Sequence, residues 1–340
     1  MSRSLRNFLI IRILLTIPMI LILATMVFFV MRVLPGDPIT STVGPRISEE
    51  ERQELREALG LDRPIPEQYF DFLGDVVTLD FGNSLVGGRR PISDELSERL
   101  PATIELTFPA MLFASLGGIL LGAIAARKRK KPTDYSIRIS SVVVYSLPVF
   151  WLGLMLQLVF SGWLNWFPLS HRIDAVIGTT LESPTNFYVL DSITTGNWDA
   201  LLSALHHLFL PCLSLGLILM GVFVRLTRVN MLEMLQSDFI TAGRARGVPE
   251  NRLTYRHALR NTFIPILTLI GLQFAILLAG AVLTETVFSW PGVGRYLVDG
   301  INNRNYTAVQ ATVTVFAIMV ASISLIMDIL YAFIDPRIRY

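Results

Sequence analysis

The chain has 340 residues, of which 52% are hydrophobic and only 16% are charged. Its apolar runs are much longer than those of a helix in a soluble core, which excludes a soluble globular protein and indicates an integral membrane protein. The net charge is only +2, and the single cysteine, Cys212, excludes an internal disulfide and a thiolate metal cluster.

Six apolar runs are each close to the roughly 20 residues that cross a bilayer as a helix. The predicted spans are residues 8–31, 104–126, 137–162, 208–224, 263–288 and 308–334. The first run follows Arg3 and Arg6 as a signal peptide would, but it is about twice as long as an apolar signal region, and no small-residue cleavage site follows it. We therefore expect a retained first span and an all-α membrane protein with six transmembrane helices.

The longest segment between spans is a first outer loop, from Arg32 to about Thr103. Within it, "SEEERQELREALG" predicts a capped helix that begins after Ser48 and ends before Gly60. "PEQYFDFLGDVVT" predicts an amphipathic helix. Its apolar stripe consists of Tyr69, Phe72, Leu73 and Val76. The polar, turn-rich segment 163–207 predicts a second outer cap, and neither cap is large enough for an enzyme domain.

The placement of positive charge predicts the orientation in the membrane. Loops 127–138 and 225–262 carry six and seven arginines and lysines, whereas loops 163–207 and 289–307 carry one and two. Short loops rich in these residues remain in the cytoplasm, and six spans place both termini on one side, so we expect both termini to be cytoplasmic. The run "RKRKK" is interpreted as a topology anchor that contacts anionic lipid, not as a nucleic-acid site.

Residue patterns typical of catalysis or metal binding are absent from the sequence. The four histidines form no H-E-x-x-H motif, no G-x-S-x-G occurs, and none of the three lysines follows a glycine as in a phosphate loop. We therefore expect no catalytic residue, no metal, no cofactor and no ATP site in this chain, so that energy for any work would come from another protein.

A few polar residues lie within the predicted spans. They are Gln157, Gln273, Thr284, Glu285 and Asp328. A charge in hydrocarbon is costly enough to suggest a function by default. For Asp328 we favour a bond to a neighbouring helix over a role in a pathway, whereas the role of Glu285 and the identity of the substrate-binding residues stay open.

The stretch "DFITAGRARGVPENRLTYRHALRN" interrupts this apolar chain between the fourth and fifth spans. Asp238 can cap a helix over residues 239–246, Gly247 can take the left-handed position after it, and Pro249 prevents its continuation. About eight residues is below the ~12 to 15 needed for marginal stability in water, so the helix needs to dock.

Two docking partners for this helix remain open from the spacing alone. Ala242, Gly243 and Ala245 form a small face that would let another backbone approach, and we expect no surface of the same chain to receive it, which favours a partner protein. The alternative is an ordinary positively charged loop that folds against the ends of its own spans.

The same stretch resembles the extended EAA loop of ABC importer permeases, in the form found in the dipeptide and oligopeptide permease family. The resemblance extends over essentially the whole chain and is greatest to the first of the two permease subunits. In chain order its motifs are "RVLPGDP", "LGLDRPIPEQY", "LDFGNSL", "RLPATIEL", "PVFWLGLMLQL", "FLPCLSLG", "LTETVFSWPGVGRYLVDGI" and "LYAFIDPRIRY".

The resemblance implies a type I importer permease fold with a large extracytoplasmic first loop. It divides the chain into residues 1–103, the first span with that loop, and residues 104–340, a five-helix core with a cytoplasmic coupling loop at 225–262. The residues that match the family's coupling helix are Thr241, Ala242, Gly243, Arg244, Ala245, Arg246 and Gly247. Thr241 stands where the general motif has glutamate, and Arg260 stands where many importers have proline.

The resemblance also implies partners and a location. They are a second permease subunit in a heterodimer, two ATP-binding subunits at the cytoplasmic face, an extracytoplasmic substrate-binding protein and membrane lipid, with no nucleic acid, in the inner membrane of a prokaryote. The implied function is ATP-driven import of dipeptides or short oligopeptides. Alternatives are import of nickel or another small solute by the same family, or a self-sufficient secondary transporter, which usually has an internal repeat.

Overall fold

The structure is a computed structural model that describes residues 3–33, 48–58, 60–84, 86 and 90–334. The "PGDP" motif and the last six residues of the C-terminal motif lie outside the described residues. In chain order the elements are α1 (Arg3–Val33), α3 (Glu49–Ala58), α4 (Ile65–Thr78), α5 (Ile92–Arg127), α6 (Pro132–Tyr145), α7 (Val149–Leu156), the π-helix η1 (Gln157–Trp163), α8 (Ala175–Gly178), α9 (Tyr188–Thr194), α10 (Trp198–Met234), α11 (Asp238–Ala245), α12 (Glu250–Arg252), the π-helix η2 (Leu253–Ala258), α13 (Leu259–Val287), α14 (Val293–Asn302) and α15 (Tyr306–Ile334).

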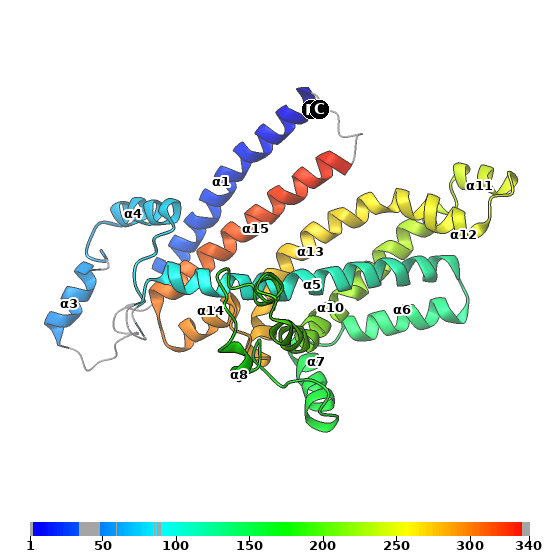
Figure 1. Ribbon diagram of the computed structural model, residues 1–340. Coiled ribbons are helices and arrows are strands. Elements are labelled where there is room, and N and C mark those ends of the chain that lie inside the picture. Colours follow the sequence, from blue (N-terminus) through cyan, green and yellow to red (C-terminus); the bar gives the residue numbers. More distant parts are fainter. Residues whose placement is uncertain (1–2, 34–47, 59, 85, 87–89, 335–340) are drawn as a thin grey trace.

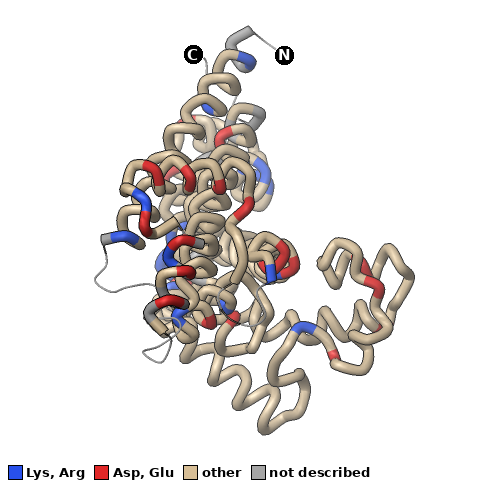
Figure 2. Tube along the Cα trace, turned by 90° about the vertical axis from the view of Figure 1, so that its left-hand side faces the viewer, with Lys and Arg blue, Asp and Glu red and all other residues tan. Residues whose placement is uncertain are grey.

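The long helices are the candidate membrane spans. Within the described residues, α1, α5, α10 and α15 are each long and apolar enough to cross a bilayer. Two bent pairs, Pro132–Tyr145 with Val149–Trp163 and Glu250–Phe263 with Pro265–Leu278, raise the number to six if each pair is one span. Figure 2 shows the long uncharged stretches along the chain. The prediction of an all-helical protein agrees with these elements, and the six spans require both bent pairs.

The third predicted span, residues 137–162, is not one straight helix. α6 ends at Tyr145, α7 begins after Pro148, and the two parts of the span meet at 101°. Proline lacks an N–H and disfavours helical geometry in the residue before it, so the first helix stops and a new one starts with Pro148 at its N-cap.

The helix that contains the second predicted span begins earlier than the apolar run. α5 begins at Ile92, 12 residues before the apolar run starts at Ile104, so the last part of the first outer loop is helical. Ile92 and Leu96 are buried against Val293 and Ala311, and this burial stabilises the additional turns as helix. The acidic residues between them hide the apolar pattern in the sequence.

The centre of the bundle is the contact between α5 and α10. A Cβ atom on Gly118 would lie 2.3 Å from the Cβ atom of Phe223, and one on Gly122 would lie 2.8 Å from the carbonyl oxygen of Val224. Glycines four residues apart let two membrane helices approach closely enough to gain dispersion contacts that lipid does not offer. α5 and α10 therefore form the closely packed centre of the bundle, and the segments at both ends of the molecule pack against them.

The outer helix α4 packs as its pattern predicts. Phe72 and Val76 are buried with Ala24 and Phe28 of α1, and Tyr69 and Leu73 pack against them, so the predicted stripe is confirmed. α3 begins directly after Ser48, as predicted. Figure 1 shows α3, α4 and α14 at one end of the bundle, and α11 with the turn between α5 and α6 at the other.

α1 and α15 lie side by side at the edge of the bundle (Figure 1). Arg12 of α1 pairs with Asp328 of α15 at 3.1 Å, which confirms that this intramembrane carboxylate bonds to a neighbouring helix. Gln157 likewise has a packing role, because its side-chain amide donates to the carbonyl oxygens of Leu169, at 2.7 Å, and Val287, at 3.2 Å.

Candidate functional site

The short helix predicted between the fourth and fifth spans is α11 (Asp238–Ala245). Its N-cap is Ser237, with extended backbone, so the prediction of Asp238 as the cap is one residue late. The carbonyl oxygen of Ser237 accepts the first bonds of the helix, from the N–H groups of Ile240 and Thr241, each at 3.1 Å. Asp238 instead lies in the first turn, where its charge complements the positive end of the helix dipole.

The predicted end of this helix is confirmed. Gly247 has φ +76°, a left-handed conformation that costs little only for a residue without a Cβ atom. Its N–H donates to the carbonyl oxygen of Arg244 at 2.9 Å, and the N–H of Val248 donates to that of Gly243 at 3.1 Å. This pair of bonds is a Schellman motif, and it turns the chain sharply toward α12.

One face of α11 docks onto its own chain, contrary to the expectation that no such surface exists. Ile240 is fully buried in a cluster with the ends of α5 and α10 and with η2. That cluster contains Ala123 and Ala126 of α5, Met231 of α10, and Leu253 and Ala258 of η2. Gly243 completes the contact, since a Cβ atom there would lie 2.7 Å from Cδ2 of Leu253. Burial of an isoleucine contributes roughly 1.5 to 3 kcal/mol, which supplies the docking that a helix of this length needs.

The opposite face of α11 is exposed. Thr241, Ala242, Ala245 and Arg246 are exposed, and at 3.6 residues per turn Ala242 and Ala245 lie on the side away from Ile240. Phe239, which is not among the seven residues predicted for the site, is also 45% exposed on this helix. The sequence pattern that could have identified Phe239 is its position three residues before Ala242, which places the aromatic ring within one helical turn of that residue. Six of the seven predicted residues, including Arg244 and Gly247, are therefore accessible, while Gly243 faces the protein.

Arg244 links α11 to the next helix, α12, through an ion pair. Its Nε donates to Glu250 at 2.6 Å, and this hydrogen bond holds the pKa of Arg244 above its ordinary value. Both side chains are about half exposed, so the pair contributes at most about 1 kcal/mol. Arg246 has no ion pair with any described residue and stays available on the exposed face.

The chain leaves this turn through η2, a π-helix that runs directly into α13. Single π-helical turns are uncommon and frequently lie at functional sites. Leu253 and Ala258 of η2 belong to the Ile240 cluster, and Arg127 at the end of α5 lies over the Tyr255 ring at 5.8 Å. α11 is therefore attached to the ends of α5 and α10 and to the start of α13 by packed side chains.

Comparison with known proteins identifies the family of the chain that contains this helix. The sequence model described as "Binding-protein-dependent transport system inner membrane component" matches residues 118–340, and the corresponding N-terminal model matches residues 5–107. The chain belongs to this family of ABC importer permeases.

Similar permeases cover nearly the whole chain. A di/tripeptide transport system permease protein of Pseudomonas aeruginosa is 41% identical over 96% of both chains. A dipeptide transport system permease protein of Alkalihalophilus pseudofirmus is 41% identical over 97% of this chain and 98% of its own, and that of Escherichia coli K12 is 39% identical over 96% of both. The chain is accordingly a multi-pass inner-membrane permease subunit of an ABC transport system.

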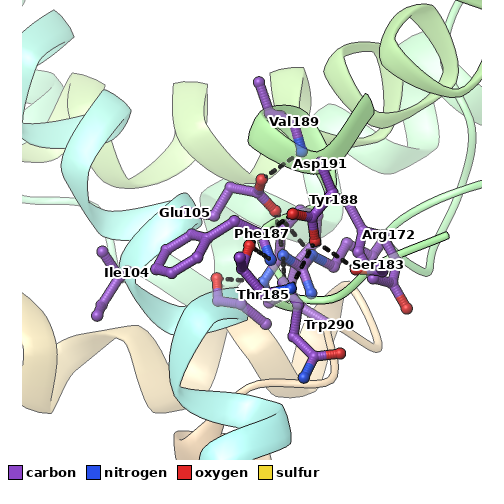
Figure 3. A network of polar contacts seen from close by, with 12 residues as sticks. Ile104, Glu105, Arg172, Ser183, Thr185, Phe187, Tyr188, Val189, Asp191 and Trp290 are labelled. Atoms are coloured by element: carbon purple, nitrogen blue, oxygen red, sulfur yellow. Dashed lines mark hydrogen bonds and ion pairs between the residues drawn. The ribbon is translucent and has the colours of Figure 1, made fainter. Parts of the chain in front are cut away.

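Away from α11, a buried ion pair fixes the cap 163–207 to α5 (Figure 3). Nε of Arg172 donates to the carboxylate of Glu105 at 2.8 Å, and its Nη2 donates to the carbonyl oxygen of Asn186 at 2.7 Å. The other oxygen of Glu105 accepts from the N–H of Val189 at 2.6 Å. Because the two side chains are only 4% and 7% exposed, this pair holds the cap in one position.

Asp191 organises the cap itself. Its carboxylate accepts from the hydroxyls of Thr185 at 2.6 Å and Ser183 at 2.7 Å (Figure 3). Burial alone would raise the pKa of Asp191, but these bonds and the nearby Arg172 hold it below its ordinary value. No local motif in the sequence marks Glu105, Arg172 or Asp191, since an acid near a span end and scattered loop residues have no characteristic spacing.

Glu285 anchors the "SWPGVG" loop, a role that the sequence left open. Its fully buried carboxylate accepts from the hydroxyl of Thr103 at 2.7 Å and from the N–H of Arg295 at 2.9 Å. The Thr103 hydroxyl in turn accepts from the N–H of Val293 at 2.9 Å. The carboxylate thus lies at the N-terminus of α14, where the helix dipole favours a negative charge, and it ties α13 to α5.

Gly292→Ala is expected to destabilise the permease by about 1 to 3 kcal/mol, the usual cost of overpacking. A Cβ atom at this position would lie 2.3 Å from Oε1 of Glu285, which its hydrogen bonds hold in place. Thermal unfolding of the purified protein measures the effect. Gly74→Ala in α4 is the matched control, because nothing lies within 4 Å of its Cβ position. Equal stability of the Gly292→Ala variant and the wild type would refute this contact.

Proposed function

We propose that this chain is one of two different permease subunits of an ATP-driven importer for dipeptides or short oligopeptides. The names of relatives in three bacteria, all about 40% identical over nearly the full length, support the peptide substrate. In this proposal residues 1–103 supply the first span and extracytoplasmic surface, and residues 104–340 form half of the translocation pathway. No ATP site is assigned to this chain, so hydrolysis takes place on two partner subunits.

The observation that carries the proposal is the two-sided docking geometry of α11. Its inner face is fixed by Ile240 to the ends of α5, α10 and η2, while Ala242, Ala245 and Arg246 remain exposed on its outer side. A helix held in this way can insert its outer face into a cleft of an ATP-binding subunit. The small side chains permit close approach, and the exposed Phe239 supplies apolar area at the rim.

This geometry gives a mechanism for coupling. A ligand shifts a conformational equilibrium only through contacts that differ between the two states, and nucleotide provides that difference by closing the cleft around α11. The packed Ile240 cluster then transmits the displacement to three spans together, since a close-packed interior moves with little compression. The pathway between the two permease subunits changes from outward-open to inward-open as a result.

Pull-down of the ATP-binding subunits tests the assignment of α11. The tagged chain, expressed together with the genes encoded beside it, is expected to retain a second permease subunit and two ATP-binding subunits through purification. Recovery of a functional chain without any ATP-binding subunit, with uptake driven by an ion gradient, would instead establish a secondary transporter.

The outer face is proposed as the docking surface of a substrate-binding protein. It consists of α3, the cap 163–207 and the loop 289–294. Figure 1 shows α3 at the end of the molecule opposite α11, and α8 of the cap below the middle of the molecule, away from α11. Both termini and α11 are then cytoplasmic, in agreement with the excess of arginine and lysine in loops 127–138 and 225–262.

Cysteine labelling is expected to confirm this orientation. In a Cys212→Ser background, cysteines at the exposed positions Arg129 and Arg252 should react with a membrane-impermeant maleimide only after the cells are opened. A cysteine at the exposed Glu182 in the outer cap should react in intact spheroplasts. The reverse labelling pattern would overturn the proposed topology.

A further inference from the structure

α6 and α10 enclose a pocket of about 300 Å³ near the end of the bundle that carries α11. The lining residues used below are Arg138, Ser141 and Tyr145 of α6, and Gly221, Arg225 and Arg228 of α10. The two helices touch at Gly221, where a Cβ atom would lie 2.8 Å from the carbonyl oxygen of Ser141 and 3.1 Å from Cβ of Tyr145. The pocket therefore lies beside a rigid helix contact.

The pocket contains more positive than negative charge. Arg228 is fixed by a bidentate bond to Asp134, at 2.7 and 2.9 Å, and Asp134 also accepts from the N–H of Lys130. Arg138 and Arg225 are exposed and form no ion pair with any described residue. Three guanidinium groups line the pocket and Asp134 supplies one carboxylate beside them, so the local charge is +2. This excess positive charge is more than the packing of α6 against α10 requires. Guanidinium groups bind best to an anion with more than one acceptor oxygen, so the pocket favours such an anion.

The depth of the pocket indicates which anion is available there. Arg225 directly follows the apolar run 208–224, and Arg138 is the second residue of the run 137–162. Both arginines thus lie where the hydrocarbon ends and lipid phosphates begin. Around them the apolar side chains of Ile139, Val142 and Val229 are 62%, 65% and 55% exposed, a surface suited to acyl chains. Tyr145 adds an amphipathic ring of the kind found at membrane interfaces.

We propose that this pocket is a specific site for the headgroup phosphate of an anionic phospholipid, with the acyl chains lying along α6 and α10. Basic pockets between membrane helices on the cytoplasmic side recognise such headgroups. The site differs from the basic turn at residues 127–131, because it combines a cavity, a guanidinium fixed by Asp134 and an apolar wall. The bound lipid would bridge α6 to α10 across their shared contact.

Photo-crosslinking with a diazirine-bearing phosphatidylglycerol tests this site. The full-length chain, together with the subunits that co-purify with it, is reconstituted in nanodiscs of phosphatidylcholine with a trace of this probe, and crosslinked peptides are mapped by mass spectrometry. The expected crosslinks concentrate on α6 and α10 around the pocket, and unlabelled phosphatidylglycerol competes for them. Phosphatidylcholine is not expected to compete.

The variant Arg138→Gln/Arg225→Gln is expected to weaken this competition about 30-fold, equivalent to about 2 kcal/mol at about 1 kcal/mol per arginine near an anionic lipid. Both residues are exposed and without an ion pair, so the fold should be retained. The matched control, Arg129→Gln/Lys131→Gln, removes the same charge from exposed positions in the adjacent turn and should keep the competition within about twofold of the wild type.

Three outcomes would overturn the site. If competition by phosphatidylglycerol is weakened equally in the two double variants, only general surface charge attracts the lipid. If competition is unchanged in both, Arg138 and Arg225 do not bind the lipid. Displacement of the probe by a dipeptide instead of by phosphatidylglycerol would assign the pocket to the transported solute.

Discussion

Gly247→Val and Ala242→Trp are each expected to reduce ATP-driven peptide uptake at least tenfold, while the chain still inserts and pairs with its second permease subunit. Gly247 has φ +76° and open space around its Cβ position, so valine there costs about 1 to 2 kcal/mol or more through the backbone alone. Ala242 is exposed, so tryptophan leaves the fold intact and blocks only the close approach of a partner. Uptake and stimulated ATP hydrolysis by the reconstituted complex measure both effects.

Two conservative substitutions separate coupling from general damage. Gly247→Asn is expected to retain most activity, because asparagine tolerates the left-handed conformation better than other residues with a Cβ atom. Ala242→Ser keeps the side chain small and should behave as the wild type. Normal uptake with normal stimulation in both Gly247→Val and Ala242→Trp would show that α11 is an ordinary loop helix.

Arg172→Gln is expected to lower the free energy of unfolding by about 3 to 5 kcal/mol, because it leaves the Glu105 carboxylate buried without its counter-ion. Glu105 is 8% exposed, and the N–H of Val189 would be its remaining partner among the described hydrogen bonds. Denaturant unfolding in detergent, followed by the fluorescence of Trp290 and the other tryptophans, measures the change. Proteolysis within 163–207 should accelerate in parallel.

The exposed pair of Arg63 and Asp71 is the control for this prediction. Its atoms lie 2.8 Å apart, but the side chains are 53% and 57% exposed, so Arg63→Gln should cost no more than about 1 kcal/mol. The double variant Glu105→Gln/Arg172→Gln should be more stable than the sum of the single effects predicts, since it leaves no buried unpaired charge. Similar stabilities for Arg172→Gln and Arg63→Gln would contradict a clamping role.

The sequence predicts the spans well where a long apolar run coincides with the helix, as in α1 and α15. It misses the early start of α5, because Ile92 and Leu96 are buried by Val293 and Ala311, which lie far away in the chain. It also misses the 101° bend, although Pro148 was a visible signal. Local patterns specify helices, whereas contacts between distant segments determine their limits.

The candidate site was likewise predictable from the sequence in its local features but not in its contacts with distant segments. Gly247 and Pro249 specify where α11 ends, because left-handed geometry and a missing N–H are properties of single residues. The burial of Ile240 could not be predicted, since it depends on where the ends of α5 and η2 meet. The pair of Glu105 and Arg172 joins residues in a span and a cap, and a single sequence offers no spacing rule for such a contact.

Uptake of a labelled dipeptide into proteoliposomes tests the central claim most directly. The chain is reconstituted with its second permease subunit, two ATP-binding subunits and the substrate-binding protein, with nucleotide supplied on the side of α11. We predict that the labelled dipeptide accumulates in the proteoliposomes only when ATP, the binding protein and the wild-type Ala242 are all present. With ADP in place of ATP, no dipeptide should accumulate. Accumulation by this chain alone, driven by an ion gradient and unaffected by Ala242→Trp, would contradict the account.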